Sequence, residues 1–488
     1  MAAQQSDVVV IGSGFGGTFA ALELIKAGCS VTLLERGPWR DTVVNQKLGI
    51  KDRASLPRGM RFFSHVVYRL HHKMLPKNGL QINRRGLMEV FVGEGVRAIC
   101  SSGVGGGSHV YSALHDRPLR SDYWDNVADG LSSEILEPYY RAALTVMDSH
   151  KPTGRGGCET PALPDGFYAL PEEKQPHLGY LLDKPRETTP YPNYREKADF
   201  HQEGMFGSYA GGKTTLDFAC LFPAMEKGLK LFAEQEVVHI QRLANGGFEV
   251  QALDKRKQFQ RYQAKRVVVA AGALNTVSLL LKSRAQGGLL GMPALGVGFG
   301  SNGDAMAQWA VKTPGVDHTQ AGVYERIFRH QDDDTGPIFM QAGVAGLSGI
   351  PMPNFLRKQM REQLFVAGMG EDAADGILDW HNGRLRIRYD ASNSPIFARI
   401  DQHFKTLTQT TDARVKAPRT PITVHPLSGA RAGDNIECSV VNGLGEVHDN
   451  KGLYITDAAA LPGALGTAPS LSIAAWAQHV AVNIALKG

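Results

Sequence analysis

Cysteine is scarce in this 488-residue chain, and its five cysteines form no recognisable pairing pattern. Cys29, Cys100, Cys158, Cys220 and Cys438 are far apart, odd in number, and include no Cys-x-x-Cys pair. This spacing argues against a disulfide framework and against a structural zinc site. We therefore predict no disulfide bonds and no metal.

A strong charge imbalance and a long apolar run are also missing. The 53 basic and 48 acidic residues leave a net charge of only +5, which does not indicate a nucleic-acid partner. No run of 18 apolar residues is present, so we expect no transmembrane segment. The N-terminal residues MAAQQSD lack the basic start of a signal peptide, which favours a cytoplasmic location.

Glycine, by contrast, is abundant, and it shapes residues 6–36. An apolar strand leads into Gly12-Ser13-Gly14-Phe15-Gly16-Gly17, and a helical pattern and a second strand ending at Glu35 follow. This order is typical of a dinucleotide-binding βαβ unit. Gly12 permits the turn, Gly14 lets the backbone approach a pyrophosphate, and Gly17 lets the helix pack closely on the sheet. The Glu35 carboxylate is placed to accept hydrogen bonds from ribose hydroxyls. We favour this interpretation over an ordinary glycine-rich turn.

Two further glycine turns suit the same cofactor. Residues 95–113 contain a loop with glycines at 103, 105, 106 and 107, whose bare backbone suits contact with a flat ring. A buried strand over 267–270 is followed by Gly272 and by a helix from about Asn275. A flexible surface turn is the alternative for the first of these.

The remaining segments are less regular. Residues 61–76 are aromatic and basic. One interpretation is a helix that touches substrate or a membrane surface; we favour the other, in which the stretch packs a domain edge. A helix is predicted over 132–147. Residues 151–205 indicate an irregular excursion that is either a lid, a cavity wall or a passive insertion. Residues 306–420 predict a second domain inserted into the first. Near the C-terminus, a strand end places His425 before Pro426, and a helix starts near Pro469.

Together these motifs resemble the glucose–methanol–choline (GMC) oxidoreductase family, in its cholesterol-oxidase-like branch, over nearly the whole chain. The motifs that carry the resemblance are GSGFGG with Glu35, GVGGGS at 103–108, GGKTTLD at 211–217, VVVAAGALNT at 267–276, LGVGFGSNGD at 295–304, VHPLSG at 424–429 and LYITDAAALPGALG at 453–466.

The resemblance implies an α/β fold in which an FAD-binding Rossmann-like βαβ domain carries an inserted α+β substrate-binding domain, as in the GMC and p-hydroxybenzoate-hydroxylase-like architecture. We assign the ranges 1–45, 90–150, 206–305 and 420–488 to the FAD-binding domain. We assign the ranges 46–89, 151–205 and 306–419 to the substrate-binding domain and lid.

The resemblance also implies site residues. The glycine loop would lie against the isoalloxazine ring, Val238 near the adenine, and Asp457 near the ribityl chain. The predicted cofactor-binding residues are Gly12, Gly14, Phe15, Gly16, Gly17, Glu35, Arg36, Gly103, Gly105, Gly106, Gly107, Ser108, Val238, Ala271, Gly272, Asp457, Ala458, Ala468 and Pro469. His425 would face the reactive flavin nitrogen, and a neutral imidazole there can accept the alcohol proton.

Two departures from the family pattern bear on function. Ala468 stands where the family often has Asn or a second His, and His109 lies one place before the position of a flavin-linking histidine, so we predict no covalent flavin bond. We expect oxidation of the CH–OH group of a hydrophobic, sterol- or terpene-like alcohol, with hydride passing to flavin N5, His425 as base, and oxygen or an unknown carrier as acceptor. A flavin-scaffold lyase or isomerase without net redox, or a catalytically weak flavin-binding partner protein, are the alternatives that Ala468 leaves open.

Overall fold

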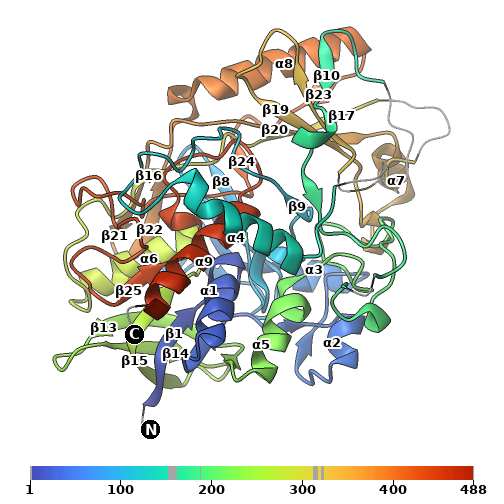
Figure 1. Ribbon diagram of the computed structural model, residues 1–488. Helices are drawn as coiled ribbons and strands as arrows, with labels where there is room; N and C mark the ends of the chain where they lie inside the picture. Colours follow the sequence, from blue (N-terminus) through green and yellow to red (C-terminus); the bar gives the residue numbers. More distant parts are fainter. Residues whose placement is uncertain are drawn as a thin grey trace.

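The protein is described by a computed structural model over residues 3–151, 162–186, 188–311, 317–319, 322 and 324–486 (Figure 1). The N-terminal strand belongs to a seven-stranded sheet. Its strands are β12 (Lys230–Phe232), β2 (Val31–Leu34), β1 (Gln4–Ile11), β15 (Phe259–Val269), β14 (Phe248–Leu253) and β13 (Glu236–Arg242) in that order, with β25 (Leu453–Ile455) beside β15. The pairs β12–β2, β2–β1, β1–β15 and β15–β25 are parallel, as the βαβ pattern requires.

Buried helices cover this parallel region. Val8, Val9 and Val10 are fully buried, which explains why the strand shows no polar alternation. Helix α1 (Phe15–Lys26) packs against α9 (Ser470–Leu486), and α9 packs against α4 (Ser133–Val146). The Ser132 side chain caps α4 by accepting a hydrogen bond from Ile135 N, so the predicted helix 132–147 is confirmed. Helix α6 (Ala273–Ala285) begins two residues earlier than predicted.

A six-stranded sheet forms the second large unit, seen in the upper part of Figure 1 beneath α8 (Pro395–Thr411). Its strands in order are β10 (Phe167–Ala169), β18 (Arg326–His330), β19 (Ile338–Ala342), β20 (Leu364–Met369), β17 (Ala305–Trp309) and β23 (Val415–Lys416). One face packs against Ile396, Ile400 and Phe404 of α8. Because side chains alternate along a strand, the residues in between point to the opposite face.

The segment 61–76 does not form a single helix. It contains the short α3 (Arg61–His65) and then β5 (Val67–His71), which pairs with two neighbouring strands. The resulting five-stranded sheet runs β24 (Ile422–Thr423), β8 (Arg97–Ser101), β7 (Met88–Val92), β5 and β6 (Leu80–Gln81). This sheet joins strands from both sides of the boundary predicted at residues 89 and 90, and the domain ranges stay a prediction.

Short elements connect these sheets. They are α2 (Val43–Lys47), α5 (Phe222–Glu226), α7 (Asn354–Arg361), β3 (Trp39–Arg40), β4 (Arg53–Ala54), β9 (Leu114–His115), β11 (His177–Leu178), β16 (Val297–Phe299), β21 (Gly376–His381) and β22 (Arg384–Arg388). Cys29, Cys100, Cys220 and Cys438 are free thiols, and Cys158 lies outside the described residues. Those residues include no cluster of potential metal ligands, and none of their helices has both the length and the apolarity needed to cross a bilayer.

Candidate active site

A continuous cavity of about 980 Å³ reaches from the βαβ turn to the six-stranded sheet. It brings together most of the residues predicted from sequence. The predicted residues that line it are Gly12, Gly14, Phe15, Gly16, Glu35, Arg36, Gly106, Gly107, Val238, Ala271, Gly272, His425, Asp457, Ala458, Ala468 and Pro469.

Four predicted residues lie behind the cavity wall instead. A Cβ on Gly17 would come within 1.9 Å of Gly12 O, so this glycine serves helix–sheet packing. Gly103 lies against the Arg40 side chain, Gly105 faces Asp217 N, and Ser108 is fully buried. These glycines shape the loop from behind, whereas only Gly106 and Gly107 present it to the cavity.

The residues of the βαβ turn fit an FAD molecule. A Cβ on Gly14 would meet no described atom within 4 Å, so glycine leaves cavity space where a pyrophosphate must approach the start of α1. Gly106 touches this turn, because a Cβ there would lie 2.6 Å from Gly14 Cα. Glu35 is 6% exposed, and its Oε2 accepts hydrogen bonds from Ser13 N at 3.1 Å and Ser13 Oγ at 2.6 Å. The carboxylate is thereby held at the edge of the cavity.

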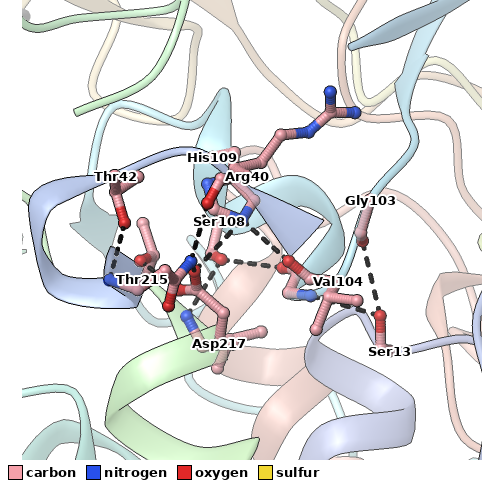
Figure 2. A network of polar contacts seen from close by, with 12 residues as sticks. Ser13, Arg40, Thr42, Gly103, Val104, Ser108, His109, Thr215 and Asp217 are labelled. Carbon is pink, nitrogen blue, oxygen red and sulfur yellow. Dashed lines mark hydrogen bonds and ion pairs between the residues drawn. The ribbon is translucent and has the colours of Figure 1, made fainter. Parts of the chain in front are cut away.

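A buried polar network fixes the glycine loop from the far side (Figure 2). His109 Nε2 lies 2.7 Å from Val104 O, and burial lowers the pKa of His109, so the neutral ring donates to this carbonyl. The Asp217 carboxylate accepts a hydrogen bond from Asn45 Nδ2 at 2.6 Å and another from Thr215 Oγ1. His109 is 1% exposed and does not line the cavity, so it contributes to the shape of the loop only.

His425 is oriented by a carboxylate that sequence reasoning did not single out. Its Nδ1 lies 3.0 Å from Oδ1 of Asp304, whose side chain is 2% exposed. The other carboxylate oxygen accepts hydrogen bonds from Thr423 Oγ1 at 2.8 Å and Val424 N at 3.1 Å. A carboxylate is only an acceptor, so Nδ1 carries the proton and Nε2 keeps its lone pair. His425 lines the cavity and its side chain is 22% exposed, so this lone pair is available to a bound molecule.

Asp457 connects the last strand to α6. Its Oδ2 accepts hydrogen bonds from Gly272 N at 2.7 Å and from Thr276 Oγ1, and its Oδ1 accepts one from Ala459 N. Burial raises the pKa of Asp457 to about 6 despite these donors. The carboxyl therefore joins two turns that line the cavity, and it can exchange a proton near neutral pH.

The six-stranded sheet presents apolar side chains to the cavity. In register, Met306 of β17 pairs with Ala367 of β20, and Ala367 pairs with Met340 of β19. Phe365 and Met369 lie two residues to either side of Ala367, on the same face. We call these five cavity-lining residues the apolar floor. Ala468 packs at its edge and offers no polar group.

Sequence reasoning missed these floor residues, Asp304 and the cavity-lining Arg69 and His71. Asp304 is the last residue of the motif at 295–304. Its place in that motif was the sequence signal that could have pointed to it. Glu371 pairs with Arg120 outside the cavity, and His381 lies on the surface of β21. His448 and His479 bond to backbone carbonyls, in keeping with structural roles.

The chain was compared with known proteins. Residues 6–291 and 389–477 match two models described as GMC oxidoreductase. Cholesterol oxidase of Mycobacterium tuberculosis is 24% identical, over 97% of this chain and 90% of that protein, and cholesterol oxidase of Acinetobacter baumannii is 23% identical, over 99% and 94%. Among solved structures, pyridoxine 4-oxidase from Mesorbium loti has a TM-score of 0.65 at 16% identity, covering 98% of both chains. A fungal aryl-alcohol oxidase has a TM-score of 0.63 at 13% identity, covering 100% of both.

Proposed function

Because the chain belongs to the GMC oxidoreductase family, and is thus an FAD-dependent oxidoreductase acting on alcohols, we propose that it oxidises the CH–OH group of an apolar alcohol, with His425 as general base. The observation that carries this proposal is the pairing of His425 Nδ1 with Asp304 in a cavity that also holds the apolar floor.

Each group has a defined task in this reaction. The chemistry that bound FAD supplies is acceptance, at N5, of the hydride that leaves the carbinol carbon. His425 Nε2 accepts the hydroxyl proton as the carbonyl forms. Asp304 keeps the Nδ1 proton in place and stabilises the imidazolium that results. Glu35 and the start of α1 would hold the ribose and pyrophosphate of FAD. The alcohol thus loses a hydride, which carries both electrons, and a proton, so the overall reaction is a two-electron oxidation.

The apolar floor supports a hydrophobic substrate. Met306, Ala367 and Met340 form one row across three strands, with the small Ala367 between the two methionines. Methionine adapts its shape to irregular apolar surfaces, which suits a bulky ring system. With Ala468 in place of a polar residue, His425 is the predicted site residue that can bind the alcohol oxygen.

The test is anaerobic reduction of the protein-bound flavin by a panel of apolar alcohols. The reduction is monitored through the absorbance of the flavin. We expect His425→Ala to keep FAD and to lose at least about a hundredfold in reduction rate, as removal of a general base implies. His381→Ala is the matched control, because His381 is exposed and does not line the cavity. A near-parental rate for His425→Ala at neutral pH would show that the proton leaves by another route.

Failure of every alcohol to reduce the flavin would instead favour the non-redox alternatives. Oxygen consumption during turnover then distinguishes an oxidase from a dehydrogenase that uses a carrier.

A further inference from the structure

Beyond the outer end of the apolar floor, the cavity is lined by polar and exposed side chains. There, Gln308 of β17 pairs with Lys416 of β23, and both side chains are exposed while lining the cavity. Ala417 and Pro418 follow, also exposed and also lining it. We call residues 414–419 the rim segment. The cavity therefore opens to solvent at residues 416–418 of this segment.

Strand β17 sets the distance from the reacting end to the rim. Asp304, which holds His425, immediately precedes β17, and Gln308 is four residues further along. At about 3.4 Å per residue, the Cα atoms of Asp304 and Gln308 are about 14 Å apart. Met306 lies midway, on the same face. Because cross-strand partners project from the same face of a sheet, the Lys416 side chain also lies on the cavity side.

The rim segment is basic and lacks compensating acid. Its charged residues are Arg414, Lys416 and Arg419, and it contains no Asp or Glu. Within the part of the chain that the structure describes, none of the three forms an ion pair. Nearby Arg399 and Lys405, by contrast, pair with Asp333 and Asp401. The ammonium group of Lys416 is therefore available to an anion that arrives with the substrate.

We propose that the substrate is an apolar alcohol that also carries a carboxylate at the end remote from its carbinol carbon, and that Lys416 binds this carboxylate at the cavity mouth. The apolar floor would cover the ring system between the two ends. This inference rests on the proposed function, because it takes His425 as the position of the reacting carbon. A steroid acid with its carboxylate at the end of the side chain has this arrangement of groups.

The first test measures binding without reaction, on the oxidised FAD-loaded enzyme. The probes are 5β-cholanic acid, which has the carboxylate but no hydroxyl, and its methyl ester, and the readout is the shift they cause in flavin absorbance. We expect Lys416→Met to weaken binding of the acid about fivefold at low salt, the upper end for an exposed ion pair, and to leave the ester unchanged. Lys227→Met, an exposed lysine beyond the end of α5, is the control.

Three results would overturn the inference. They are equal binding of acid and ester by the parent, an equal effect of Lys416→Met on both probes, or no binding of either probe.

The second test uses lithocholic acid and its methyl ester as reductants of the flavin. We expect the parent to favour the acid in kcat/KM and Lys416→Glu to reverse that preference. If neither compound reduces the flavin although cholanic acid binds through Lys416, the proposed oxidation fails while the carboxylate site stands. If both compounds react equally in the parent and in Lys416→Glu, the oxidation stands and the carboxylate site is refuted.

Discussion

Replacing Asp304 by Asn tests whether the carboxylate acts through His425. The variant keeps the size of the side chain but introduces an amide nitrogen. Oδ2 of Asp304 already accepts hydrogen bonds from Thr423 Oγ1 and Val424 N, so an amide oxygen is favoured there and the NH2 group is directed at His425 Nδ1. Nδ1 must then accept a hydrogen bond, and Nε2 becomes protonated. The imidazole is in the wrong tautomer to act as a base.

The expected loss follows from that tautomer change. A general base contributes about a hundredfold to ten-thousandfold, which corresponds to about 3–5 kcal/mol of activation free energy. We expect Asp304→Asn to lose nearly all of this rate enhancement, measured by stopped-flow flavin reduction, and to retain FAD. In a His425→Ala background, Asp304→Asn should change the rate by less than about twofold, because a positioning residue has nothing left to position.

A histidine–carboxylate pair elsewhere provides the control. Asp333 Oδ2 lies 2.9 Å from His403 Nε2, on the side of the sheet covered by α8 and away from the cavity. Asp333→Asn should lower the unfolding free energy yet leave flavin reduction and its pH profile unchanged. Equal losses from Asp304→Asn in the parent and in His425→Ala would refute the reasoning, since they would show that Asp304 acts independently of the imidazole.

Two further predictions concern the cofactor site. Glu35→Ala should weaken FAD binding about ten- to a hundredfold, as loss of charge-assisted hydrogen bonds of roughly 1.5–3 kcal/mol implies. Glu23→Ala should not, because Glu23 pairs with Lys26 on α1 and does not line the cavity. FAD retained equally by parent and Glu35→Ala on dilution would contradict the assignment of Glu35. Burial raises the pKa of Asp457 from 3.8 to about 6, so the folded apoprotein holds a proton that the unfolded chain releases between these values. Its unfolding free energy should therefore fall as pH rises through this window, by about 3 kcal/mol at most, and Asp457→Asn should remove that part of the dependence in urea titrations.

The cofactor half of the site was predictable because its information is local. The turn from Gly12 to Gly17, its flanking strands and Glu35 lie within one βαβ unit, where periodicity and glycine spacing determine the structure. The same holds for Gly272 at the start of α6. In each case the residues that form the feature are neighbours in sequence.

The contact between His425 and Asp304 was not predictable in this way, because 121 residues separate the two. The two meet because Gly300 and Leu427 exchange backbone hydrogen bonds of 3.0 and 3.1 Å and so align the two segments. The strand within residues 61–76 was equally hidden, because Val67–His71 is held by pairing with β7 and β6, which lie outside that segment.

Strands β17 and β20 each present one face to α8 and the other to the cavity, and this arrangement affects how the enzyme can evolve. Substitutions at 309, 364 and 366 alter the packing of α8, whereas substitutions at 306, 308, 365 and 367 alter the lining of the cavity. Helix packing and cavity lining are thus encoded at alternating residues of the same two strands. A lineage, or a directed-evolution library, that varies only the cavity-facing positions can explore new alcohols while the helix-facing positions preserve the scaffold.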